Sequence, residues 1–330
     1  MLDKWFSVDG LNVVLILVSG ILAYFFPLEL FILSFAILGP LHYFTEINWL
    51  NEKQFFTADA KQWLLFGIIA SLLLVIPKIV FKYLGDFEEL IQFFTSINNF
   101  TNGLLFGSFV FAVGLSFSLS KIQKIVLALV SLGLAYILNG MYYYALFFGV
   151  LLPTVIHVYI FTLFFMAYGA KKSNSALGFL GVVLALLIPV VYMYINLDGV
   201  TYLFPDFLKS VYLDNNLHVT PVLFSKFLGL SDGTSFFFYE KLELRMMMFF
   251  SFIYLYHYLN WFSKTTVISW HKSINIKKGT VIVGLWVFML FLFYIDFTLG
   301  FLVSLFFSFL HVILELPLNV ASVKGVFSKQ

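Results

Sequence analysis

The sequence predicts an all-α protein, a polytopic bundle of about ten transmembrane helices with both chain ends in the cytoplasm. Hydrophobic residues make up 62% of the 330 residues and charged ones only 11%, against about 25% in ordinary soluble domains. Apolar runs of roughly 17 to 25 residues recur along the chain and are long enough to cross a bilayer as helices. Lysines gather in alternate connections between these runs, which is typical of cytoplasmic loops.

Ten apolar runs are predicted to span the membrane. In chain order they cover residues 10–26, 28–50, 62–84, 103–119, 122–138, 141–168, 176–196, 243–262, 279–295 and 298–318. The first run lacks a basic flank and a small-residue cleavage site, so we expect it to be retained as a span. The segment 86–102 and the connection 197–242 are more polar, and we expect short interfacial helices in both.

Lysine positions predict the orientation of the bundle. Short turns near Pro27, Gly140 and Asp296 carry no lysine or arginine, and these turns are therefore assigned to the outer side. The opposite connections and the tail carry lysines at positions 53, 61, 121, 124, 171, 172, 264, 272, 277, 278, 324 and 329. We predict one integral membrane domain over residues 1–330, with an extracytoplasmic loop at 197–242.

The same features predict a multi-pass protein of the bacterial inner (cytoplasmic) membrane, with the lipid bilayer as its surroundings. Eighteen lysines against one arginine, Arg245, are typical of an AT-rich bacterial genome. A net charge of +2 gives no indication of a nucleic-acid partner. The absence of cysteine excludes disulfides, iron–sulfur clusters and thiolate-held haem, so nitrogen or oxygen atoms must hold any metal ion.

Four of the six histidines lie inside predicted spans, namely His42, His157, His257 and His311. Under the predicted topology all four spans run from outside to inside. Each histidine precedes the next cytoplasmic lysine by 7 to 14 residues. At about 1.5 Å per residue, their depths agree to within about ten ångströms. The pattern predicts that four parallel helices bring one imidazole each to the cytoplasmic half of the bundle.

Two of these histidines have a glutamate four residues later, in "HYFTE" (His42, Glu46) and "HVILE" (His311, Glu315). Residues four apart share a helix face, so each pair projects into one place. An ionised carboxylate in hydrocarbon costs at least ~2.5 kcal/mol, and a bound cation would offset that cost. Imidazole and carboxylate without thiolate suit iron, manganese or zinc. The glutamates are expected to be ligands or to orient the histidines.

Prolines and small polar residues lie close to the same histidines. Proline interrupts the helical hydrogen bonds and can open a cavity beside these side chains. The prolines are Pro40, Pro153 and Pro317, and the polar residues that could hydrogen-bond the histidines are Thr154, Asn260 and Ser308. His271, in a lysine-rich connection, is a possible further ligand, and His218 is expected at the surface of the outer loop.

The stretch "GPLHYFTE" at 39–46 resembles the G-x-P-H-G-x-x-D-H signature of Brp/Blh-type membrane β-carotene oxygenases. Tyr43 stands where the signature has its second glycine, and no histidine follows Glu46. The resemblance implies that His42 is a ligand of non-haem iron, with Glu46 at the acidic position. It also implies that His157, His257 and His311 serve as the other ligands and that the substrate is a carotenoid.

The sequence therefore predicts a membrane metalloenzyme, a non-haem iron oxygenase that acts on an apolar, lipid-soluble substrate such as a carotenoid. Glu46 and Glu315 would be its catalytic carboxylates and, with the four histidines, its metal ligands. Two alternatives remain open at this point. The same cluster could carry protons or divalent metal ions in a transporter, because histidine–carboxylate relays are typical of pumps and carriers. Paired histidines could also hold haem, although this would leave both glutamates unexplained.

Overall fold

A computed structural model of the chain describes residues 7–98, 100–115, 117, 119–138, 141–264 and 269–328. Within these ranges the protein is helical and has no β-strand, which confirms the predicted all-α class. The helices are α2 (Val8–Phe25), α3 (Pro27–Leu33), η1 (Ser34–Leu38), α4 (Gly39–Glu52), η2 (Gln54–Phe56), α5 (Ala60–Tyr83), α6 (Glu88–Asn98), α7 (Thr101–Leu115), α8 (Lys121–Leu138), α9 (Tyr142–Tyr144), η3 (Ala145–Phe161), α10 (Thr162–Ser173), α11 (Ala176–Tyr194), α12 (Asp206–Asp214), α13 (Val219–Phe227), α14 (Lys241–Ser263), η4 (Trp270–Ser273), α16 (Ile276–Ile295) and α17 (Phe297–Phe327).

Eight helices of the described chain are long and apolar enough to cross a membrane. Two of them are continuous across several labels, namely Pro27–Glu52 (α3, η1 and α4) and Tyr142–Ser173 (α9, η3 and α10). The other two predicted spans also form helices, but α7 has only 15 residues and α14 has three charged residues among its first five. The polytopic bundle is thus confirmed, whereas the count of ten spans and their orientation stay predictions.

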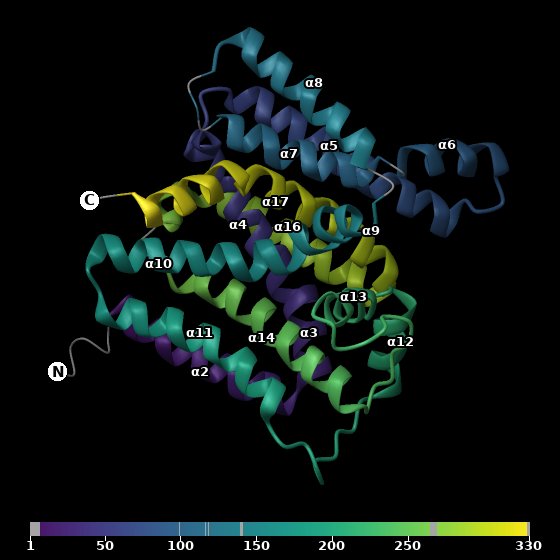
Figure 1. The fold of residues 1–330 in the computed structure, drawn as a ribbon, viewed down its shortest axis with the longest axis vertical. Coiled ribbons are helices and arrows are strands. Elements are labelled where there is room, and N and C mark those ends of the chain that lie inside the picture. The colour runs from purple at the N-terminus through teal and green to yellow at the C-terminus, as the bar shows by residue number, and fades with distance from the viewer. Residues whose placement is uncertain are drawn as a thin grey trace.

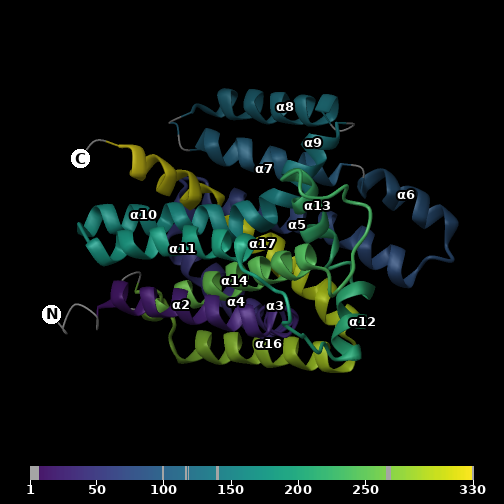
Figure 2. The same ribbon diagram turned by 60° about the horizontal axis from the view of Figure 1, so that its bottom comes forward.

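The central helices are those that carry the histidines, and the remaining helices surround them. In Pro27–Glu52, 67% of the most apolar window is buried inside the protein, against 11% in α8 and in α16. Figure 2 shows α7 and α8 along one edge and α16 along the opposite edge, with α4, α14 and α17 between them. Both described chain ends lie at one end of the bundle, as an even number of crossings requires, and α12 and α13 lie at the other (Figures 1 and 2).

Short helices occupy both of the polar segments in which they were expected. Helix α6 has no buried residue and projects from the bundle beside α5 (Figure 1). Helices α12 and α13 lie in the 197–242 connection, and α12 packs against α3 and α17. Their position at a membrane surface stays a prediction.

Two of the three prolines near the histidines are associated with π-helix, a wider coil than the α-helix. Before Pro40, residues Ser34–Leu38 form η1, and the Gly39 N–H donates to the Ser34 carbonyl five residues earlier. Pro153 lies inside η3, which also contains His157. Proline cannot donate an N–H, and its ring clashes with the carbonyl four residues before it, so the wider coil accommodates it. The irregular geometry is therefore placed beside two of the four histidines.

Two apolar clusters meet where the histidines lie. One joins α2, α3, η3, α11 and α14, and includes the buried Ile16, Phe250 and Phe252. The other joins α4, α5, α7 and α17, and includes the buried Leu50 and Ile313. The burial of apolar side chains in these clusters fixes the four central helices against one another, and hence fixes the relative positions of their polar residues.

Candidate metal centre

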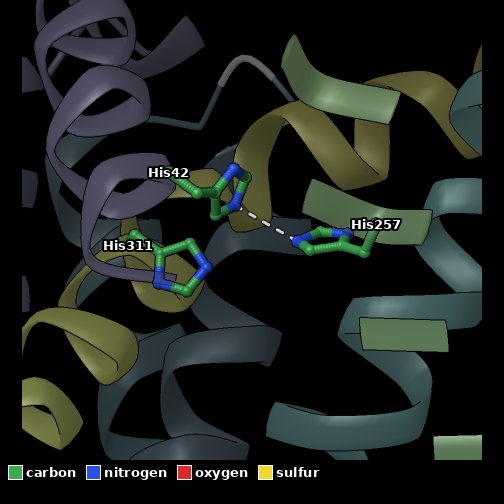
Figure 3. Close-up of side chains that lie close together, drawn as sticks. All are labelled: His42, His257 and His311. Carbon is green, nitrogen blue, oxygen red and sulfur yellow. Dashed lines mark hydrogen bonds between the residues drawn. The ribbon is translucent and has the colours of Figure 1, made fainter. Parts of the chain in front are cut away.

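The four intramembrane histidines come together from four different helices. His42 lies on α4, His157 on η3, His257 on α14 and His311 on α17. The four imidazoles lie around a common centre, so that each is next to two others. Neighbouring centroids are 4.7 Å (His42–His257), 5.2 Å (His257–His157), 4.9 Å (His157–His311) and 5.3 Å (His311–His42) apart. All four imidazoles are at most 7% exposed. Figure 3 shows three of them, His42, His257 and His311, converging on one region.

The Nε2 atoms face the middle of this arrangement. His157 Nε2 lies 3.0 Å from His311 Nε2, and His257 Nε2 lies 3.2 Å from His42 Nε2. Ring nitrogens of His42, His257 and His311 all lie within 4.8 Å of one another, and His157 adjoins this trio through His311. Two nitrogens bound to one metal ion at ~2.1 Å are ~3.0 Å apart at a right angle and ~3.4 Å apart at the tetrahedral angle. Each of these two pairs has the spacing of neighbouring ligands, and His42, His257 and His311 form a group that could hold one ion.

The Nδ1 atoms of two histidines have hydrogen-bond partners, and that of a third lies beside a carboxylate. His257 Nδ1 lies 2.8 Å from Thr162 Oγ1, and His311 Nδ1 lies 3.3 Å from the carbonyl oxygen of Phe307. His157 Nδ1 lies 3.1 Å from a carboxylate oxygen of Glu315. Metal-binding histidines almost always have such an outer partner, because it fixes the tautomer and the ring orientation. The buried Nδ1 atoms of His42 and His157 have no aligned hydrogen-bond partner, so Glu315 lies close to His157 without a hydrogen bond to it.

Glu46 and Glu315 occupy different places relative to the ring of nitrogens. Glu46 Oε2 lies 2.9 Å from His42 Nε2, the same atom that faces His257, yet this oxygen has no aligned hydrogen-bond donor. The two atoms therefore lie close together without a hydrogen bond, which is compatible with two ligands of one ion. Glu315 instead contacts the outer nitrogen of His157 and accepts a hydrogen bond of 3.0 Å from Asn319 Nδ2. The geometry thus favours Glu46 as a ligand and Glu315 as an orienting carboxylate.

The two carboxyl groups also interact directly with each other. Glu46 is 1% exposed, and the side chain of Glu315 is 14% exposed. Glu46 is therefore shielded from bulk solvent. Two adjacent buried carboxylates repel one another unless a proton or a cation lies between them. No lysine or arginine pairs with either carboxylate among the described ion pairs, so the arrangement lacks a cation of its own.

Two tyrosines cover the outer face of the histidines. The Tyr43 ring stacks on His311, with centroids 4.5 Å apart and an interplanar angle of 24°. Its hydroxyl lies 3.2 Å from the Tyr258 hydroxyl, and the Tyr258 ring lies 5.1 Å from that of His42. A Cβ atom at Gly39 would come within 2.8 Å of the Tyr43 hydroxyl. Glycine is therefore required at this position for the tyrosine pair to fit.

A small cavity of about 30 Å³ adjoins the histidines on the side toward the C-terminal ends of the helices that carry them. Three of the four histidines and both glutamates line this cavity, whereas His311 does not. The lining side chains are His42, Glu46, His157, Phe161, Thr162, Phe165, His257, Asn260, Trp261, Glu315 and Leu318. A volume of about 15 Å³ is enough for one water molecule, so the cavity has room for one or two water-sized molecules beside the nitrogens.

Several expectations about neighbouring residues are wrong. The Thr154 hydroxyl donates to the carbonyl of Val150 rather than to His157. Asn260 accepts from Tyr256, and Ser308 interacts with Tyr43. Each of these residues lies one helical turn from a histidine, but its hydrogen-bond partner is the helix backbone or another side chain.

The remaining two histidines lie apart from the ring. His271 is exposed on η4 and does not line the cavity. His218 is half-buried rather than at the surface, and its ring packs against Tyr212 and Phe236. Burial lowers the pKa of His218, and an interaction with the backbone of Tyr212 partly opposes that shift.

Sequence reasoning missed four residues of the centre, namely Tyr43, Thr162, Tyr258 and Asn319. Asn319 had a readable signal, because it follows Glu315 by four residues on the same helix face. Thr162 and Tyr258 had none, since their contacts join helices that are far apart in the chain. Comparison of the chain with protein-family models, curated proteins and solved structures found no match. The resemblance of "GPLHYFTE" to the Brp/Blh signature therefore stays a prediction.

Proposed function

We propose that this chain is a membrane metalloenzyme, a non-haem iron oxygenase that acts on a lipid-soluble substrate. The observation that carries the proposal is the convergence of four imidazoles from four helices, in which two pairs of Nε2 atoms have the spacing of neighbouring ligands. At ~2.1 Å from an ion, the spacings of 3.0 and 3.2 Å correspond to angles of about 90° and about 100°. Imidazole together with carboxylate, without thiolate, is the donor set of non-haem iron oxygenases.

The cavity beside the nitrogens supports a reaction with a small gaseous molecule. About 30 Å³ of space adjoins the histidines and Glu46, which would leave room for a small ligand on a bound ion. That space suits water or dioxygen and is too small for a lipid. Bound iron would supply the electron transfer to dioxygen that organic side chains cannot provide. The protein's own residues hold the donors and exclude bulk water, and Asn319 holds Glu315 beside the outer nitrogen of His157.

Oxidative cleavage of a carbon–carbon double bond is a reaction that balances without a further reductant. One C=C bond and one O–O bond break, and two C=O bonds form. This stoichiometry suits a membrane protein for which no electron-donating partner is evident in the sequence. A carotenoid, the substrate implied by the resemblance at 39–46, provides such bonds and reaches the protein through the bilayer.

A second candidate function is transport of a divalent metal ion. A cavity of about 680 Å³ lies on the other side of the histidines from the small cavity, and no histidine lines it. Thr154, Tyr254 and Ser308, each three residues before a histidine, line its inner end, and Asp214 lies further out. With the smaller cavity on the cytoplasmic side, the histidines lie between two spaces, and a carrier needs access from both faces. An ion would then bind reversibly and leave without any chemical change.

Oxygen consumption by the purified full-length protein tests the proposal. The iron-loaded protein in detergent is supplied with β-carotene or with a lipid extract from the expression host, and uptake of dioxygen is followed together with the products. We expect uptake that depends on iron and is lost in His42→Ala, His157→Ala, His257→Ala and His311→Ala, with His218→Ala as the matched control. Full metal occupancy in His257→Ala, or a haem absorption band, would contradict the proposal. Metal flux into proteoliposomes without oxygen uptake would favour the transporter.

A further inference from the structure

A second, larger cavity lies next to the metal centre at the end of the bundle where both described chain ends lie. Its volume is about 640 Å³, within the range of small-molecule sites. It lies between the first turns of α2 and α11 and the last turns of α10 and α14. Its wall is apolar toward the interior, where Met166, Ala170, Leu177 and Gly181 line it. The cavity therefore has an apolar inner end, and polar side chains line its other end.

The polar end of this cavity carries more positive than negative charge. Lys172 and Lys264 line it, and neither has a carboxylate within 4.0 Å among the described ion pairs. Lys264 is half-buried, and its Nζ lies 4.5 Å from the centre of the Phe165 ring. Lys171, by contrast, points away and donates to carbonyls near the C-terminus, including that of Val326 at 2.8 Å. The charged and titratable groups around Lys264 are Asp9 on α2 and Tyr168 and Lys172 on α10.

Phe165 separates this cavity from the histidines, because its side chain lines both spaces. It lies one turn after Thr162, whose hydroxyl contacts His257. A chain of buried polar groups also leads from the large cavity to the small one. The Tyr256 hydroxyl lies 3.3 Å from Asn12 Oδ1 in the wall of the large cavity and 3.4 Å from Asn260 Oδ1 in the wall of the small one. One aromatic ring and one hydrogen-bonded path thus connect the two spaces.

We propose that the large cavity binds the substrate as a long-chain carboxylate, with its carboxylate at Lys172 and Lys264 and its chain directed past Phe165 toward the histidines. The binding itself depends only on these residues, whereas the role of the ligand as substrate rests on the proposed oxygenase function. A hydrocarbon carotenoid has no group for the two lysines. The charge of the cavity therefore favours an acidic amphiphile over the hydrocarbon that the resemblance implies.

Two kinds of variant separate the charge of this cavity from its space. Lys172→Met and Lys264→Met remove one positive charge each while keeping an unbranched apolar stem. Gly169 lines the cavity, and a Cβ atom there would meet nothing within 4 Å, so Gly169→Leu fills the space without a clash. The matched controls are Lys53→Met, at an exposed lysine outside the cavity, and Gly133→Leu, at an equally open glycine on α8.

Binding is measured with cis-parinaric acid, a fluorescent long-chain carboxylate, on the full-length protein in detergent, both metal-free and iron-loaded. Stearate, its methyl ester and an anionic lysophospholipid are the competitors. We expect saturable binding in both forms of the protein, displaced by stearate at lower concentration than by the other two. Lys172→Met and Lys264→Met should weaken binding of the carboxylate by about tenfold or more each and leave that of the ester unchanged. Gly169→Leu should weaken binding of both, and the controls neither.

Three results would overturn this assignment. They are absence of saturable binding, equal affinity for the carboxylate and its ester, and preference for the lysophospholipid, which would make the cavity a site for membrane lipid. In an iron-loaded protein that consumes oxygen, an unchanged KM in Gly169→Leu would overturn the role of the cavity in substrate binding alone. Failure of the oxygenase proposal would instead appear as absent oxygen uptake while probe binding and its dependence on the two lysines persist.

Discussion

Replacement of the two glutamates by glutamine should affect metal binding to different extents. Glu315 contacts only the outer nitrogen of His157, at 3.1 Å, and loss of such an outer partner weakens metal affinity by about 10 to 100-fold, or ~1.4 to 2.7 kcal/mol. Glu315→Gln keeps an oxygen that can accept from His157 and should lie near tenfold. Glu46 lies 2.9 Å from the inner nitrogen of His42, so Glu46→Gln removes the charge of a ligand. Glu46→Gln should therefore lower the metal affinity by more than about 100-fold, which is the largest effect expected for a residue outside the ligand shell.

The assay is competition with a chelator of known affinity for iron(II), under anaerobic conditions, on detergent-purified protein. Zinc serves as a second ion that has no redox chemistry. Glu29→Gln is the matched control, because Glu29 is half-buried and lies 13 residues, about 20 Å, before His42. Equal losses in Glu46→Gln and Glu315→Gln, or a greater loss in Glu315→Gln, would refute the different roles that we assign to the two carboxylates.

Three further changes test other parts of the structure. Thr162→Val removes the partner of His257 Nδ1 and should weaken iron binding about tenfold in the chelator assay, whereas Thr162→Ser should retain it. Gly39→Ala brings a Cβ within 2.8 Å of the Tyr43 hydroxyl and should lower the free energy of unfolding, measured by thermal denaturation, by about 1 to 3 kcal/mol. Adding Tyr43→Phe removes that hydroxyl and should restore part of the lost stability. A double variant no more stable than Gly39→Ala would contradict the clash. Burial lowers the pKa of Lys264 to about 7, so affinity for cis-parinaric acid should fall as the pH rises through that value, because the ammonium group loses its charge. A fall of the same size in Lys264→Met would show that another group titrates.

The sequence predicted the helices well because a long apolar run in a bilayer has few alternatives to a helix. Helix ends were predicted less well. Helix α17 continues to Phe327, beyond the expected end at 318, because the polar residues that close an apolar run do not stop a helix. The prolines indicated irregular helix near Pro40 and Pro153, but the π-helical form of η1 and η3 depends on packing against neighbouring helices.

Within the metal centre, too, local features could be predicted from the sequence, whereas features that depend on packing between helices could not. The pairs His42–Glu46 and His311–Glu315 could be read from their spacing on one helix. The different positions of the two glutamates could not, because they depend on where α4 and α17 meet η3 and α14. The contact between Thr162 and His257 joins residues 95 apart, and no local pattern indicates it. The tyrosine pair likewise exists because Gly39 makes room for it, which becomes visible only when both helices are in place.

X-ray absorption at the metal edge of the purified, iron-loaded protein tests the central proposal most directly. Four imidazoles that bind one ion should give a first shell of nitrogen and oxygen only, at ~2.1 Å, with the outer-shell scattering of about four imidazole rings. That scattering should decrease by one ring in His157→Ala and stay unchanged in His218→Ala. A spectrum without imidazole scattering, or one that is identical in wild-type protein and His157→Ala, would contradict the assignment of these four histidines as metal ligands.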